Sequence, residues 1–179
     1  MREAFGRKDM SYDDIYRHVT EPQEVYLFEQ ELNGILKILG MASYNRRILL
    51  GIPSLIVEGI AINPSMQGKN LFKRMTELAR DDEAVICLRT QNPRMYRALE
   101  KYCSFVYPNG KEIPKAVRAI RDEFALCIGS NADEKGIVRG YYGWLFYGEE
   151  PTHKNVGEFF RKIGLNLYEG DALLAIGIK

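Results

Sequence analysis

The segment Ser54–Leu78 constrains the fold of this 179-residue chain more than any other. Leu55–Ile62 is an almost unbroken apolar run rich in β-branched residues, and Glu58 is its only charge. Such a run is typical of a central strand that is covered on both faces. After Gly68, apolar residues recur at the spacing of a helix. They are Leu71, Met75 and Leu78. We therefore predict a buried strand, a turn and an amphipathic helix.

The turn between this strand and this helix favours phosphate binding. The first turn of a helix has unpaired N–H groups and a partial positive charge, which together attract anions. The N–H groups expected around a pyrophosphate are those of Gln67, Gly68, Lys69, Asn70 and Leu71. Basic side chains for further phosphates are Lys69, Lys73, Arg74 and Arg94.

The chain before this segment predicts a helix and an antiparallel hairpin. Ser11 is placed to cap a helix over residues 11–20. The apolar stripe of that helix is Tyr12, Ile15, Tyr16 and Val19. Asn33-Gly34 is a strong hairpin signal, because β-prone segments flank it over residues 25–28 and 35–44. These strands should lead into the central strand as a meander.

The chain after this segment predicts a second strand–helix unit. Ala84–Leu88 is apolar, Asn92 is a natural N-cap and Pro93 a natural first helical residue. Strand–helix–strand order with short turns implies that the two central strands are parallel. Further helices are expected around residues 113–124 and 156–163, and strands over 138–147 and 172–178. The aromatic residues of 138–147 could form core, an oligomer surface or the wall of a substrate cleft.

Composition excludes several classes of function. Lys and Arg number 25 against 24 Asp and Glu, so no overall charge favours nucleic acid or an anionic membrane. The three cysteines follow no metal-ligand spacing, and the N-terminus has no signal-peptide core. We expect one domain over residues 1–179, in the cytoplasm, with no metal site.

Two motifs carry a resemblance to a known family. INPSMQGKNLFKRMTELA, residues 62–79, resembles the acetyl-CoA-binding segment of the GNAT superfamily of N-acetyltransferases. There, a strand that ends near a proline is followed by Gln/Arg-x-x-Gly-x-Gly/Ala at the start of a helix. LRTQNPRMYRALEKY, residues 88–102, is similar to the next strand and helix of the family. The resemblance covers roughly residues 54–106.

The resemblance implies a fold and an activity. The fold would be α/β, with a mixed, mostly antiparallel twisted sheet and helices on both faces. The activity would be transfer of the acetyl group of acetyl-CoA to a primary amine of a small molecule or a peptide. It implies neither nucleic acid nor membrane as a partner, and a homodimer is left open.

The resemblance also assigns roles to residues. Glu58 is the candidate general base, and its alternative is a structural ion pair. Leu99 occupies the position at which the family usually has the tyrosine that protonates the leaving thiolate. The candidate general acids are therefore Tyr96 and Tyr102. The strand edge at Ile60, Ala61 and Ile62 would bind the pantetheine arm as an added strand does. Asn92 and Arg94 would complete the cofactor site.

The same comparison shows two departures from the family pattern. Asn70 stands where glycine is usual, and Phe72 stands where glycine or alanine is usual. The ring of Phe72 would either crowd the phosphates or turn into the core. The alternative function is therefore a catalytically inactive GNAT-like fold that serves as a CoA-binding or protein-interaction module.

Overall fold

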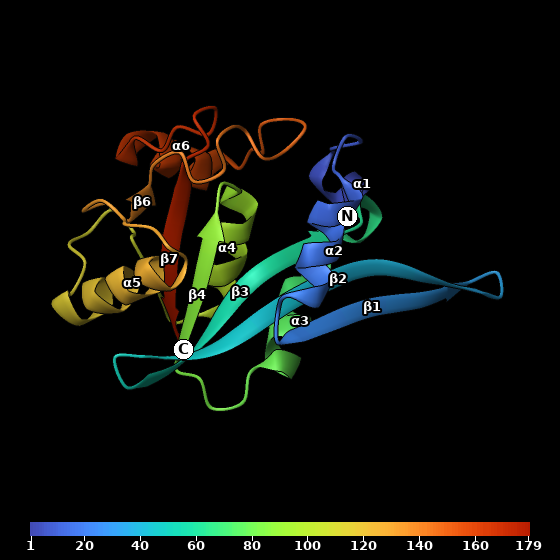
Figure 1. Cartoon of the computed structure of the whole chain (residues 1–179), viewed down its shortest axis with the longest axis horizontal. Coiled ribbons are helices and arrows are strands. Elements are labelled where there is room, and N and C mark those ends of the chain that lie inside the picture. The colour runs from blue at the N-terminus through green and yellow to red at the C-terminus, as the bar shows by residue number, and fades with distance from the viewer.

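A computed structural model describes residues 1–179 of the chain, apart from the side chain of Leu32. The helices are α1 (Arg2–Phe5), α2 (Tyr12–Thr20), α3 (Leu71–Ala79), α4 (Pro93–Tyr102), α5 (Lys115–Cys127) and α6 (Lys154–Ile163) (Figure 1). The strands are β1 (Glu24–Leu32), β2 (Ile35–Leu49), β3 (Ile52–Ile62), β4 (Val85–Thr90), β5 (Phe105–Tyr107), β6 (Ile137–Val138) and β7 (Ala172–Ile178). A short 3-10 turn, Pro64–Met66, precedes α3.

All strands of the described residues belong to one sheet, in the order β1-β2-β3-β4-β7-β5, with β6 on β7. The β3–β4 pair is parallel, and the other pairs are antiparallel. Successive side chains of a strand point to opposite faces, so β4 contributes to two cores. Ile86 and Leu88 pack with α3, α4 and α6, whereas Val85 and Cys87 pack with α5. The predicted fold class, a mixed and mostly antiparallel sheet with helices on both faces, is confirmed.

Several local predictions are also confirmed. Ser11 caps α2 by accepting a hydrogen bond from the backbone of Asp14, and Asn92 caps α4 in the same way. Asn33 takes the positive φ of a hairpin turn between β1 and β2. The strands β3 and β4 are parallel, as the strand–helix–strand order indicates.

Two local predictions are wrong, and one pattern is only partly covered. In the apolar stripe of α2, Ile15 is half-buried against the cluster of Phe5, Met10, Met41 and Ala61, whereas Tyr12, Tyr16 and Val19 are exposed. Leu78 of α3 is 70% exposed, and Ala79 takes the buried position. Within residues 138–147 only Val138 is in a strand, and the rest form a loop.

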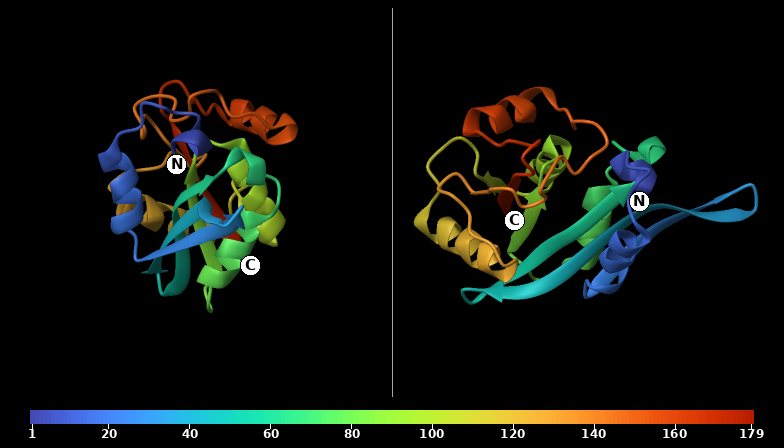
Figure 2. Two further views of the ribbon diagram at one scale, coloured as in Figure 1. Left: turned by 90° about the vertical axis from the view of Figure 1, so that its right-hand side faces the viewer. Right: turned by 45° about the horizontal axis from the view of Figure 1, so that its top comes forward.

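The hairpin of β1 and β2 projects beyond the rest of the chain (Figures 1 and 2). Apolar side chains exposed on it are Leu27, Ile35, Leu36 and Ile38. Within the described residues, no helix combines the length and the apolarity that crossing a bilayer requires.

The strands β3 and β4 separate halfway along β3. They pair from Ser54 to Val57 of β3, and beyond that point β3 continues to Ile62 bonded only to β2 (Figure 1). On the β2 side, Ser43 pairs with Gly59 and Tyr44 pairs with Val57, so Glu58 is the extra residue of a β-bulge. Bulges of this kind bend a strand and redirect a side chain. The split and the bulge therefore occur at the same residue.

Candidate functional site

A cleft of about 340 Å³ opens where β3 has left β4 and where α3 and α4 begin. The predicted cofactor residues that line it are Ile60, Ile62, Gln67, Gly68, Asn70, Leu71, Asn92 and Arg94. Two others do not line it. Ala61 packs with Phe5 on the other side of the sheet, and the Lys69 ammonium lies 3.4 Å from the Met66 sulfur. The cofactor role of all these residues stays a prediction.

The N-terminus of α3 faces this cleft with unpaired donors. Asn70 precedes the helix in the left-handed conformation, with φ of 59°, which asparagine tolerates better than most residues. The N–H groups of Leu71, Phe72 and Lys73 donate to no acceptor among the described residues. Asparagine in place of the usual glycine therefore still permits an anion-binding helix terminus.

Phe72 does not close the cleft. Its ring is 5% exposed and belongs to the core cluster between the sheet, α3 and α4. It meets the ring of Tyr102 edge to face, with centroids 6.3 Å apart. Phe72 also lines the cleft, but a ring that is 5% exposed within the core cluster has turned into the core rather than towards the phosphate position.

Basic residues line the cleft without acidic ones. Lys73 comes from α3, and Arg94, Arg97 and Lys101 follow one face of α4. None of the described lining residues is Asp or Glu. Arg74, which the sequence also suggested, instead lies over the ring of Phe28. Arg97 and Lys101 replace it as candidate phosphate partners.

We expect Arg97→Gln and Lys101→Gln each to weaken acetyl-CoA binding about three- to tenfold, because each removes one positive charge from the lining of the cleft. The effect of Arg97→Gln should be the smaller of the two, since Arg97 also pairs with Glu100 at 3.0 Å. The dependence of affinity on salt should also become shallower, since fewer charges remain to be screened. Calorimetric titration at two salt concentrations measures both effects. Lys162→Gln, on the exposed end of α6, is the matched control, and an equal loss there would contradict this assignment.

A second pocket, of about 250 Å³, lies beside the cleft. Four residues line both cavities: Phe5, Ile60, Met95 and Tyr147. The second pocket is further lined by Glu58 and Gly59 of β3, by Arg89 and Thr90 of β4 and by His18 of α2. A Cβ on Gly59 would lie 3.1 Å from the His18 ring, so α2 packs closely against β3 at this glycine.

Glu58 lies on the wall of the second pocket. One carboxylate oxygen accepts a hydrogen bond of 2.8 Å from the Asn45 amide. The other lies 3.3 Å from Nη2 of Arg89, with side-chain exposures of 21% for Glu58 and 15% for Arg89. Glu58 is thus ion-paired, which is the structural alternative expected for it, and it also lines a cavity; its role as a general base stays a prediction.

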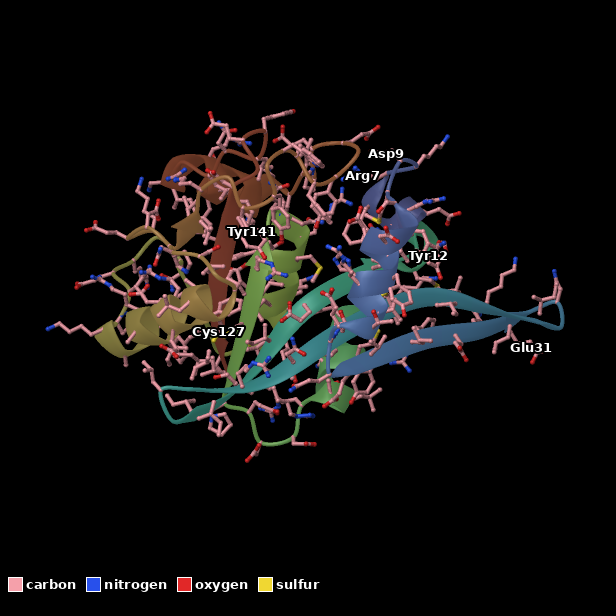
Figure 3. The ribbon with its side chains drawn as sticks, in the orientation of Figure 1. Arg7, Asp9, Tyr12, Glu31, Cys127 and Tyr141 are labelled. Carbon is pink, nitrogen blue, oxygen red and sulfur yellow. The ribbon has the colours of Figure 1, made fainter. Side chains whose placement is uncertain are left out.

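Arg89 is held by aromatic side chains. Its guanidinium lies 4.9 Å from the centroid of Tyr141, which Figure 3 places against β4. Burial acts against the charge of Arg89, but Tyr142, Tyr141 and Glu58 together raise its pKa. Burial raises the pKa of Tyr142, and Arg89 opposes that shift. The guanidinium therefore remains a fixed positive charge in the pocket.

The tyrosines belong to the loop that was expected to be a strand. Buried Gln91 holds this loop, because its side chain accepts from the Phe146 N–H at 2.8 Å and donates to the Trp144 carbonyl at 3.3 Å. Positive φ angles at Gly140 and Gly143 interrupt the strand pattern. These two glycines were the sequence signal for a loop, whereas the Gln91 contacts connect residues far apart and leave no local pattern.

The two predicted acids lie outside both cavities. The Tyr96 hydroxyl donates to the Pro108 carbonyl at 2.5 Å, and the Tyr102 hydroxyl is buried without a partner among the described residues. Tyr147, which sequence reasoning did not single out as an acid, lines both cavities instead. Burial raises the pKa of Tyr147, and its contact with Asn92 opposes that shift.

No family model and no curated protein matches this chain. Two solved structures are loosely similar. The GphF GNAT-like decarboxylase in complex with isobutyryl-CoA is 16% identical with a TM-score of 0.42, over 94% of this chain and 85% of that one. The loading GNATL domain of CurA from Lyngbya majuscula is 15% identical with a TM-score of 0.43, over 98% and 88%. Both descriptions name a GNAT-like fold, and so loose a likeness carries no argument beyond that.

Proposed function

We propose that this chain is an acyl-CoA-dependent N-acyltransferase, which moves the acetyl group of acetyl-CoA to a primary amine. One observation carries the proposal. A basic cleft at a helix N-terminus and a pocket that holds a carboxylate meet at the split between β3 and β4. Two substrates that enter from the two cavities would have their reactive ends beside the four shared residues.

The residues of the cleft fit acetyl-CoA. The N–H groups at the start of α3 would bind the pyrophosphate, and Arg97 and Lys101 would neutralise further phosphates. The edge of β3 at Ile60 and Ile62 is released from β4 and would bond the pantetheine arm. When bound, acetyl-CoA supplies a thioester carbonyl that an amine can attack.

Two side chains would move the protons. Glu58 would accept a proton from the attacking amine, directly or through a water, as the C–N bond forms. Tyr147 would donate a proton to the sulfur as the C–S bond breaks, because a tyrosine phenol is already protonated at neutral pH and burial raises its pKa further. The products are then an N-acetyl amine and the free thiol of CoA, and a proton passes from Glu58 to Tyr147 through water to restore both side chains.

Tyr147→Phe is expected to lower kcat about a hundredfold and to leave acetyl-CoA affinity unchanged, since only the proton donor is removed. Release of CoA thiol under saturating substrate measures kcat. Tyr102→Phe and Tyr96→Phe are the competing variants. If either of them lowers kcat and Tyr147→Phe does not, the donor is on α4 as the sequence suggested.

Two measurements test the proposed function. Calorimetric titration tests acetyl-CoA binding, and amine-dependent release of CoA thiol across a panel of primary amines tests transfer. Binding together with amine-dependent release supports the proposal. Absence of binding at millimolar acetyl-CoA overturns the cofactor assignment, and binding without release for any amine overturns the transfer.

The second candidate function is a CoA-binding or protein-interaction module without turnover. It is favoured by the engagement of Glu58, whose two carboxylate oxygens already contact Asn45 and Arg89. The exposed apolar side chains of α2 and of the β1–β2 hairpin would then serve protein contacts, including those of a homodimer. This candidate predicts acetyl-CoA binding and a flat transfer assay.

A further inference from the structure

The second pocket has an unusual charge content. Among its described lining residues, Glu58 is the only acidic side chain and Arg89 the only arginine or lysine, and the one histidine is His18. Phe5, Val57, Leu88, Met95 and Phe146 are apolar, and Thr90, Tyr141, Tyr142 and Tyr147 add hydroxyls. A partly apolar cavity with one anion and one cation side by side complements a ligand that carries one cation and one anion.

The geometry of the pair leaves both groups able to bind a ligand. The pair has one contact, of 3.3 Å, rather than the two parallel bonds of a bidentate Arg–carboxylate pair. An arginine has five N–H donors, of which Glu58 takes one and Tyr142 at most one. The ring of Tyr141 packs against the guanidinium, with its centroid 4.9 Å away. At least three donors therefore remain for a carboxylate, which is the group this fork binds best.

We propose that the acceptor is a free α-amino acid with an apolar side chain, whose amino group meets Glu58 and whose carboxylate meets Arg89. This inference rests on the proposed transfer and names its substrate class. The amino group and carboxylate of an α-amino acid share one carbon, which matches two protein charges that are themselves in contact. The apolar lining would take the side chain.

The size of the pocket supports a single amino acid. Its volume of about 250 Å³ is below the usual range of roughly 300–1,000 Å³ for ligand pockets. In a peptide or a protein lysine, the carboxylate would not lie next to the reacting amine. The bound ammonium first loses one proton to water by way of Glu58, because only the neutral amine can attack. The reaction then forms the C–N bond of an N-acetyl amino acid, breaks the C–S bond, and transfers a second amine proton to the departing sulfur by way of Glu58 and Tyr147.

Matched ligands isolate the carboxylate. L-leucine, L-leucinamide and 3-methylbutylamine share the side chain and the amine, and methionine and phenylalanine provide parallel sets. Calorimetric titration into the protein saturated with CoA measures binding without turnover. We expect each amino acid to bind at least about tenfold more tightly than its amide and its amine, because a charge-assisted hydrogen bond is lost in each analogue.

Variants assign the preference to Arg89. Arg89→Met should make the acid and its analogues bind equally, and Arg89→Lys should retain part of the preference, because a lysine keeps the charge but not the fork. Arg118→Met, exposed on α5 and outside both cavities, is the matched control. If Arg89→Met does not fold, the comparison of ligands on the unaltered protein still decides the matter.

The outcomes separate this inference from the proposed function. Analogues that bind as tightly as the amino acids, or a panel in which nothing binds at millimolar concentration, would overturn it. Thiol release that is equally fast with amines and amino acids leaves the transfer standing and overturns the substrate class. Amino acids that bind with the expected preference and are never acetylated support the pocket assignment and overturn the transfer.

Discussion

Glu58→Gln is expected to lower kcat/KM for amine acetylation about a hundred- to ten-thousandfold, the usual range for loss of a general base. Glutamine has the shape of glutamate and can still accept a hydrogen bond from Asn45, so the bulge in β3 should persist. What it lacks is a carboxylate that can take up the amine proton. Acetyl-CoA affinity should not change, because Glu58 lines the second pocket and not the cofactor cleft.

The measurement is the rate of CoA thiol release, with acetyl-CoA affinity determined in parallel by calorimetry. Glu158→Gln makes the same chemical change on the exposed face of α6, outside both cavities, and should leave the rate unaltered. An unchanged kcat/KM in Glu58→Gln would show that the Glu58–Arg89 pair is structural and that another group takes the proton.

The sequence predicts the cofactor side of the site better than the acceptor side. Residues 54–78 and 85–102 are contiguous strand–turn–helix units, so their apolar periodicity and the caps at Asn92 and Pro93 determine where each element begins. The cleft follows from these local patterns because both of its helices start next to the strands that precede them. Gln67, Gly68 and Leu71 accordingly lie where the pattern indicates.

The acceptor side depends on contacts between distant segments. The bulge at Glu58 is a property of the register between β2 and β3, which neither strand encodes alone. Tyr141, Tyr142 and Tyr147 have strand propensity, yet Gln91 holds their loop across the end of β4. From the sequence, Arg89 is only the residue that ends a strand. Its place in the pocket is indicated by its ion pair with Glu58, which lies on another strand.

Helical periodicity has a similar limit. It identifies the apolar face of α2 correctly but does not show whether another element covers that face. Tyr12 and Tyr16 stack on one another in solvent, with ring centroids 6.1 Å apart (Figure 3 labels Tyr12). In α3 the last buried position is Ala79 rather than the expected Leu78, and Phe72 is buried as well. Which side of a helix is buried is decided by the packing partners, here the sheet and α4.

Phe72→Ala is expected to destabilise the fold by about 3–4 kcal/mol, in the range for a buried phenylalanine. The ring is 5% exposed and packs against Tyr102 in the core, so alanine would leave a cavity that the neighbouring strands and α4 cannot fill. The melting temperature should fall by roughly 10 °C. Chemical and thermal denaturation measure both quantities, and Leu78→Ala, one and a half turns later on the same helix and 70% exposed, should cost less than about 0.5 kcal/mol.

The same variant tests whether the cofactor site tolerates a large residue at position 72. Because the ring faces the core and the phosphate would be held by backbone N–H groups, acetyl-CoA affinity of folded Phe72→Ala should stay within about threefold of the unaltered protein. A ring that instead crowded the phosphates would give the opposite result, with tighter binding and little loss of stability. That outcome would place Phe72 in the cleft and remove the main structural reason for regarding the helix N-terminus as open to a cofactor.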